Sequence, residues 1–222
     1  MTLSHRSSEM NRLITNHGEL HPRYTSNIIN TINRAIEDHP RTMAIRIDLR
    51  IPADQYYSEH GHSSDSPSYF ADTDRKVISR FICSLKAQVN ADLLRKKKLG
   101  IRTSKNNLRY TWAKEYGSDN KPHYHVLLLL NKDNYAYLGS YQNLSGNLAS
   151  KIQKAWTSAL RLDFEYYKKS VHFPKNPVYL LNASSFDYPH VYEELLYRAS
   201  YLAKLETKLY GTGTRSFGCS QR

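Results

Sequence analysis

The stretch that decides the fold is the apolar run near the middle of the chain, Pro122-His-Tyr-His-Val-Leu-Leu-Leu-Leu-Asn131. This run, preceded by a polar connection, predicts a strand over His123–Leu130. Side chains alternate along a strand, so His123 and His125 point to one side and Tyr124 points to the opposite, buried side. Two imidazoles on one face can hold a single divalent cation, although two merely polar residues at the start of a strand would give the same pattern.

A second alternating segment precedes this strand. Over Leu108–Tyr116, Glu115 falls on the face with the polar and small residues, and Trp112 falls on the apolar face. The polar connection Gly117–Pro122 predicts a hairpin, in which Glu115 lies beside His123 or within one register step. Glu115 is therefore the candidate third ligand, and a slip of one residue would turn it to the wrong face.

The rest of the chain supplies further strands and helices. Thr42–Ile51 alternates as a strand with one buried and one polar face, and two short runs, Val171–Phe173 and Val178–Leu181, predict a hairpin. Apolar residues at helical spacing predict helices over residues 25–37, 77–93, 148–159 and about 188–209. Because strands and helices do not alternate as βαβ units, we predict an α+β fold with a central antiparallel or mixed sheet and helices packed mainly on one side.

The length of 222 residues suits one domain. Residues 1–24 form a polar N-terminal segment, and residues 25–222 form the predicted domain. Within it, residues 53–71 are rich in Ser, Asp, His, Gly and Pro, which predicts a long loop.

The composition indicates a polyanionic partner. Lys and Arg outnumber Asp and Glu by 32 to 20, a net charge of +12, and 18 residues are Tyr. Such an excess favours nucleic acid, and Tyr interleaved with Lys or Arg suits stacking on bases and contact with phosphates. A single cluster such as Arg95-Lys-Lys-Lys98, taken alone, is equally typical of a solvated helix face.

Several classes of protein are excluded. No apolar run reaches the roughly 18 residues of a transmembrane helix, and the first residues lack the apolar core of a secretory signal. Cys83 and Cys219 are too few and too far apart for a disulfide framework or a cysteine zinc site. We therefore expect a soluble, cytoplasmic protein that has no membrane partner.

The last predicted helix carries a second candidate site. Tyr197, Tyr201 and Lys204 follow the spacing i, i+4 and i+7, so they share one face, away from the packing stripe. A phenol among cations suits phosphoryl transfer, because positive neighbours favour the phenolate and stabilise charge on the phosphate. The alternative is an exposed aromatic pair that packs on a neighbour.

Together these motifs resemble a known group of enzymes. His123-Tyr-His125, preceded by Glu115 and followed by Tyr197-x-x-x-Tyr201-x-x-Lys204, resembles the HUH endonucleases, and more narrowly the rolling-circle replication initiators of phages and plasmids. Lys121–Asn131 and Arg215-Ser-Phe-Gly-Cys-Ser220 are similar to the YagK/YfjJ C-terminal, or inovirus replication-protein, family of bacterial prophages.

This resemblance implies a fold and a chemistry. The sheet would have about five antiparallel strands, with the histidines on a central strand facing the tyrosine helix. Mg²⁺ or Mn²⁺, held by His123, His125 and Glu115, would polarise the scissile phosphate. Tyr201 would attack it and leave a 5′-phosphotyrosyl link and a free 3′-OH. Tyr197 would be the second nucleophile, and Lys204 would support the charge of the phosphate or phenolate.

The resemblance also implies partners. Single-stranded or hairpin DNA would be the substrate, with Arg46, Arg50, Arg109 and Lys208 as candidate DNA contacts, and a host helicase is a candidate partner. The roles of Arg46, Asp48 and Arg50 stay open, because the first strand lacks the Thr-rich pattern common in replication initiators; Asp48 could instead pair with an arginine. The oligomeric state is open as well.

Two other functions fit the same residues. A non-catalytic DNA-binding regulator on the same fold would use the charge and the tyrosines equally well. A single-strand transposase or a relaxase would use the same chemistry. The chain contains no Walker A glycine loop, so a fused helicase is not expected.

Overall fold

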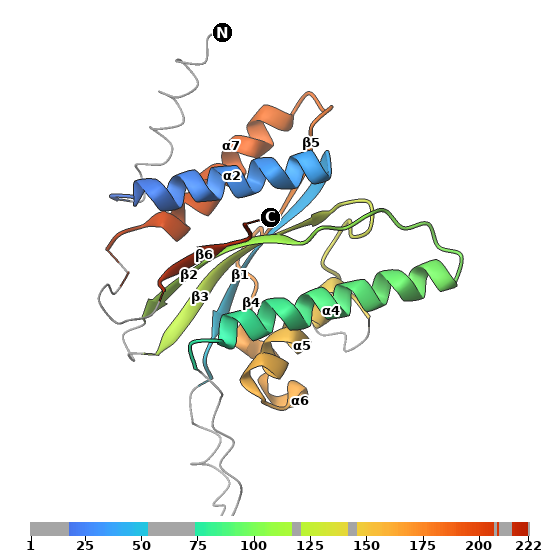
Figure 1. The fold of residues 1–222 in the computed structure, drawn as a ribbon, viewed down its shortest axis with the longest axis horizontal. Coiled ribbons are helices and arrows are strands. Elements are labelled where there is room, and N and C mark those ends of the chain that lie inside the picture. Colours follow the sequence, from blue (N-terminus) through green and yellow to red (C-terminus); the bar gives the residue numbers. More distant parts are fainter. Residues whose placement is uncertain are drawn as a thin grey trace, which may run out of the picture. The chain divides into compact units, whose positions relative to one another are not determined.

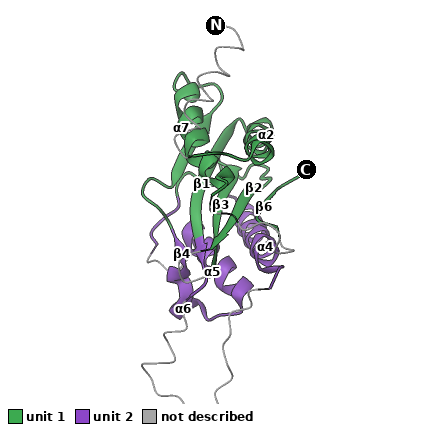
Figure 2. Cartoon of the chain, turned by 90° about the vertical axis from the view of Figure 1, so that its left-hand side faces the viewer, with its two compact units in different colours: residues 1–48, 102–137, 173–222 green, residues 49–101, 138–172 purple. Residues whose placement is uncertain are grey.

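The computed structural model describes residues 18–52, 74–116, 121–141, 146–206, 208 and 215–221. The chain forms two compact units (Figure 2): residues 1–48, 102–137 and 173–222 belong to the first unit, and residues 49–101 and 138–172 to the second. The predicted loop at 53–71 and most of the polar N-terminal segment lie outside the described residues. The prediction of a single domain from residue 25 onward stays a prediction.

The sheet of the first unit is antiparallel where its register is defined. Its strands follow the order β5-β1-β3-β2-β6, so β3, which carries His123 and His125, lies in the centre as expected. The fold is therefore α+β, as predicted, and the described residues contain six strands when β4 of the second unit is included. The strands are β1 (Arg41–Arg50), β2 (Arg109–Tyr116), β3 (Pro122–Asn131), β4 (Val171–His172), β5 (Val178–Asn182) and β6 (Phe217–Cys219).

One predicted pairing was wrong. The runs around Val171 and Val178 were expected to form a hairpin, but β5 pairs with β1 instead, with Met43 opposite Leu180. Short apolar runs separated by a few residues do not reveal whether each pairs with the other or with a third strand.

Two helices cover one face of this sheet (Figure 1). Helix α2 (Pro22–Asp38) and helix α7 (Tyr188–Ser200) both pack on the cluster of small and aliphatic residues that the strands present on that face. Within the first unit the helices thus lie on one side, as predicted. The cluster contains Ile28, Ile32 and Ala35 from α2, Leu195, Leu196 and Ala199 from α7, and Ala44, Ala113, Leu127 and Leu129 from the strands.

Helix α7 ends earlier than the apolar spacing predicts. It stops at Ser200, a 3₁₀ turn covers Tyr201–Ala203, and Lys204 is extended, with φ −56° and ψ 133°. The backbone beyond the turn pairs with the segment before α2: His21 N donates to Ala203 O at 2.9 Å, and Leu205 N donates to Glu19 O at 3.0 Å. This pairing over a long sequence distance replaces the last helical turns.

The second unit is mainly helical. Helix α4 (Val77–Lys98) packs on helix α5 (Leu148–Leu160), where Phe81 meets Trp156 edge to face with ring centroids 5.9 Å apart. A short helix α6 (Phe164–Tyr167) and a 3₁₀ turn (Lys168–Ser170) follow. The predicted stripe of α4 is buried at Val77, Ile78, Phe81, Ile82, Leu85 and Val89. In the part of the chain that the structure describes, no helix is both long and apolar enough to cross a membrane.

Candidate metal centre and tyrosine site

The hairpin of β2 and β3 brings two histidines and one carboxylate to the same face. Glu115 lies directly opposite His123 in the antiparallel register, and Ala113 lies opposite His125. Side chains directly opposite one another in such a pair share a face, and so do residues two positions apart on one strand. The alignment of Glu115 with His123 therefore agrees with the register that the short polar connection predicted.

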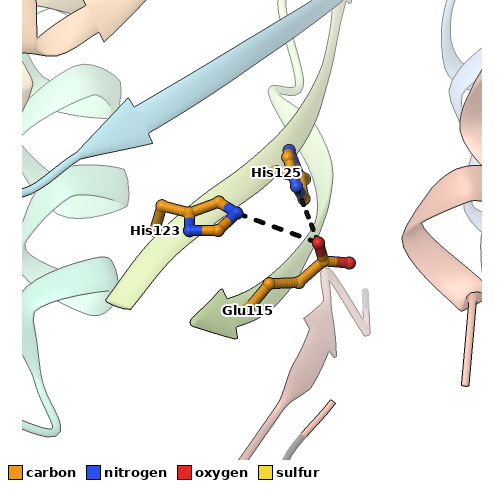
Figure 3. A group of neighbouring side chains, drawn as sticks. All are labelled: Glu115, His123 and His125. Carbon is orange, nitrogen blue, oxygen red and sulfur yellow. Dashed lines mark hydrogen bonds and ion pairs between the residues drawn. The ribbon is translucent and has the colours of Figure 1, made fainter. Parts of the chain in front are cut away.

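The three side chains converge (Figure 3). Glu115 Oε2 lies 3.0 Å from His125 Nε2 and 3.8 Å from His123 Nε2. One potential ligand atom from each residue lies within 4.8 Å of the others. Glu115 is 2% exposed and His125 8%, whereas the His123 side chain is 27% exposed. Glu115 and His125 are thus buried in the protein, and His123 is accessible to solvent.

Asp48 of β1 determines the orientation of the His125 ring. Its Oδ1 lies 2.5 Å from His125 Nδ1, and Arg46 Nη2 lies 2.7 Å from the same nitrogen. Asp48 Oδ1 also accepts from Arg46 Nη1 at 2.5 Å. A guanidinium can only donate, so Nδ1 cannot serve both neighbours. We assign the Nδ1 proton to the bond with Asp48, which leaves Nε2 directed at Glu115.

The two carboxylates control protonation at His125. Burial by itself lowers the pKa of His125, but the hydrogen bonds to Asp48 and Glu115 outweigh burial and raise the pKa above its ordinary value. Burial would likewise raise the pKa of Asp48, but the bond from His125 and the charge of Arg46 hold it well below its usual range. Below this pKa a cation that binds Nε2 must displace a proton, so metal binding should strengthen as the pH rises through the pKa of His125.

Lys208 forms an ion pair with the second carboxylate oxygen of Glu115, Oε1. Its side chain is fully buried, and Nζ lies 3.4 Å from Glu115 Oε1 and 2.7 Å from the carbonyl oxygen of Lys204. Burial lowers the pKa of Lys208, and Glu115 acts in the opposite direction. Because Oε1 faces Lys208, the other oxygen, Oε2, is turned toward the histidines.

Tyr201 lies next to His125. Its ring meets the ring of His125 edge to face, with centroids 5.1 Å apart. Burial raises the pKa of the Tyr201 phenol and the Glu115 carboxylate raises it further, while Lys204 and Arg46 act in the opposite direction without outweighing them. The pKa of Tyr201 is therefore raised, whereas nearby cations were expected to lower it and favour the phenolate. The sequence does not reveal that Tyr201 is half-buried beside a carboxylate.

Tyr197 and Lys204 lie in different surroundings. Tyr197, one helical turn before Tyr201, lines a cavity of about 810 Å³ between α7 and β5, together with Tyr179 and Arg198. Lys204 lies beyond the end of the helix, and its Nζ forms an ion pair with Glu206 at 2.9 Å. The charge of Lys204 still acts on Tyr201, but the two residues do not share a continuous helical face.

Three of the four expected DNA contacts are turned into the protein. Arg46 is 5% exposed and binds Asp48, Arg109 is 7% exposed and pairs with Asp38 at 2.6 Å, and Lys208 is buried at Glu115. Only Arg50 of these four is exposed. Arg46 does lie on the same face of β1 as Ala44, as the alternation predicts. That face is not open to solvent, because α2 and α7 pack on it.

Asp48 has a second contact that the sequence does not predict. The sequence allows it an arginine partner, and it does bind Arg46, but its contact with His125 depends on β1 and β3 being neighbours in the sheet. A signal existed, because Asp48 alternates onto the same face as Ala44 and Arg46.

We expect Asp48→Asn to weaken metal binding while the fold persists. Loss of the carboxylate that orients a histidine ligand typically costs about 10- to 100-fold in metal affinity. Titration calorimetry with Mn²⁺ would measure the effect, with Asp38→Asn as the control, because Asp38 binds Arg109 instead of a histidine. Equal Mn²⁺ affinity in wild type and Asp48→Asn would contradict the orienting role.

Comparison with known proteins identifies the family. The sequence profile described as the YagK/YfjJ C-terminal domain matches residues 3–220. The chain belongs to this family. YagK of Escherichia coli (strain K12) is 40% identical over 198 residues, which is 89% of this chain and 92% of YagK. YfjJ of the same organism is 34% identical over 200 residues, 89% of this chain and 93% of YfjJ.

The resemblance to the YagK/YfjJ family is thus confirmed. YagK and YfjJ are both described as uncharacterized proteins, so membership assigns no activity. Among solved structures, the N-terminal nuclease domain of minute virus of mice non-structural protein 1 is similar, with a TM-score of 0.26 and 12% identity, over 87% of this chain and 78% of that chain. A similarity of this size is too weak to support a statement about chemistry.

Proposed function

We propose that this member of the YagK/YfjJ family is a metal-dependent endonuclease and transesterase of single-stranded DNA, which nicks a replication origin through a 5′-phosphotyrosine intermediate, as a rolling-circle initiator does. The observation that carries the proposal is the meeting of Glu115, His123 and His125 within 4.8 Å, with the Tyr201 ring against His125. A metal-ligand set beside a phenol suits phosphoryl transfer better than it suits binding alone.

The residues fit a divalent cation. Two imidazole nitrogens and one carboxylate oxygen are an ordinary donor set for such an ion, and His125 has the carboxylate partner that metal-bound histidines usually have. When bound, the ion would act as a Lewis acid on the scissile phosphate. Of the two proposed ions, the imidazole donors suit Mn²⁺ better than Mg²⁺, which prefers oxygen.

The proposed reaction exchanges one phosphate ester for another. Tyr201 Oη attacks the phosphorus and loses its proton, and the bond from phosphorus to the 3′ oxygen breaks. The 3′ oxygen takes up a proton and leaves as a 3′-OH, while the 5′ phosphate stays on the tyrosine. Glu115, which raises the pKa of Tyr201 in the metal-free protein, would repel the phenolate less once it ligates a cation.

The other expected residues receive narrower roles. Tyr197 is the proposed second nucleophile and, in its cavity with Tyr179, could also stack on a base of the strand. Lys204 is proposed to stabilise charge on Tyr201. Arg50 remains a proposed DNA contact, whereas Arg46 and Lys208 are proposed to hold Asp48 and Glu115 in place.

A denaturing gel tests the proposal. The protein would be mixed with end-labelled single-stranded DNA that carries the origin region of its own replicon, with Mn²⁺ or with EDTA. We expect a covalently shifted band with Mn²⁺ and none with EDTA. DNA binding without a covalent band under either condition would favour the non-catalytic regulator and overturn the enzymatic proposal.

A further inference from the structure

A cationic cluster in the second unit is built around one buried carboxylate. Asp92 of α4 is 6% exposed and accepts from Arg95 Nη2 at 2.9 Å. Lys96 Nζ lies 3.1 Å and Lys151 Nζ 3.6 Å from the same carboxylate. Lys151, on α5, also donates to the carbonyl oxygen of Gly146. Three cations thus share one negative charge, which leaves a net positive charge at this place.

The cluster borders a cavity. A hollow of about 430 Å³ is lined by Arg95, Lys151, Lys154 and Ser150, and Asp92 also contributes to its wall. Ser150 lies in the first turn of α5, where the helix dipole favours negative charge, while its own N–H donates to the capping side chain of Asn147 at 2.8 Å. Burial lowers the pKa of Lys151, with Asp92 opposing it, so an anion in the hollow would stabilise the charged lysine.

The surrounding helices extend the positive charge. Helix α4 carries six Lys or Arg residues with Asp92 as its single acid, and α5 carries two Lys and no acid. Four of these cations form the last turn of α4, and Lys97 and Lys98 are exposed next to the cluster. A hollow lined by several cations, at the end of a helix whose last turn exposes further cations, suits a chain of regularly spaced negative charges better than a single small anion.

We propose that the hollow between the end of α4 and the start of α5 binds phosphodiester groups of a nucleic-acid chain, independently of base sequence and of metal. It is composed of other residues than the Glu115–His123–His125 site and does not depend on the proposed nicking activity. It would hold the nucleic acid through its backbone, the kind of contact that positions without specifying sequence.

A matched pair of double variants of the full chain tests this site. Arg95→Gln with Lys154→Gln removes two exposed cations from the hollow. Arg75→Gln with Lys76→Gln removes the same two residue types, also exposed, from the opposite end of α4. Binding of a labelled oligonucleotide of arbitrary sequence, single-stranded and duplex, would be measured in EDTA over a range of salt concentrations. Thermal unfolding would show that both variants remain folded.

We expect the Arg95/Lys154 variant to bind about tenfold more weakly than wild type and the Arg75/Lys76 variant to differ by less than about twofold. The salt dependence of log affinity for the single strand should become shallower by roughly 1.4 in the first variant only, since each lost phosphate contact accounts for about 0.7. Equal losses in both variants, or no loss in either, would overturn the site.

Two other ligands would also overturn it. If inorganic phosphate binds in an Arg95- and Lys154-dependent way and the oligonucleotide does not, the hollow takes a small anion. If vesicles containing anionic phospholipid bind in an Arg95- and Lys154-dependent way and the oligonucleotide does not, the surface recognises a membrane.

Discussion

Tyr201→Phe is expected to abolish the covalent protein–DNA adduct, with a fall of at least about a thousandfold, because removal of a nucleophile leaves no atom to form the bond. Phenylalanine keeps the ring that meets His125 edge to face, so the fold and the metal ligands should persist. The measurement is the amount of covalent band after reaction with Mn²⁺ and labelled single-stranded DNA, compared with wild type at equal protein concentration.

Tyr197→Phe is the matched control, because it removes the same hydroxyl one helical turn away, at the cavity lined by Tyr179 and Arg198. We expect it to keep most of the adduct. Adduct that survives in both single variants and disappears in the double variant would indicate that the two tyrosines replace one another. Adduct in the double variant would exclude both as nucleophiles.

His123→Ala is expected to lower Mn²⁺ affinity by at least about a hundredfold and to remove the adduct with it, because one of the three proposed protein ligands is lost. His123 is the most exposed of the three, at 27% for its side chain, so its removal leaves the buried contacts of Glu115 and His125 in place. Calorimetry would give the Mn²⁺ affinity, and the denaturing gel would give the adduct.

His172→Ala provides the control for this change, because His172 is an exposed histidine on β4, outside the ligand group. It should leave both readouts unchanged. Binding of DNA in EDTA should also be unchanged in His123→Ala, which separates loss of the metal from loss of the nucleic acid. Unaltered adduct formation in His123→Ala would exclude this residue as a ligand that the reaction requires.

The grouping of Glu115, His123 and His125 was predictable from the sequence for a local reason. The alternation over Leu108–Tyr116 and His123–Leu130 determines which side chains share a face, and the short connection leaves few possible registers. The observed pairing of Glu115 with His123 is one of those registers. The sheet class followed from the same patterns, whereas the partner of Val178–Asn182 did not, because nothing in a five-residue run identifies the strand beside it.

The electrostatic setting was not predictable in the same way. Arg46, Arg109 and Lys208 are ordinary surface residues by composition, yet each lies buried against a carboxylate, namely Asp48, Asp38 and Glu115. Each of these pairs except Arg46–Asp48 joins residues more than 70 positions apart. Such pairs depend on which elements meet, and sequence spacing carries no information about that.

By itself, then, the sequence determined the period of each strand, the face shared by Glu115, His123 and His125, and the positive charge of the chain, because all three depend on residues close together or on simple counts. Only the tertiary structure decided that α7 stops at Ser200 and that Asp48 orients His125. It also decided that Tyr201 is half-buried beside a carboxylate. The physical reason is that helix ends, burial and charge pairing are set by whichever distant backbone and side chains compete for the same hydrogen bonds and the same space.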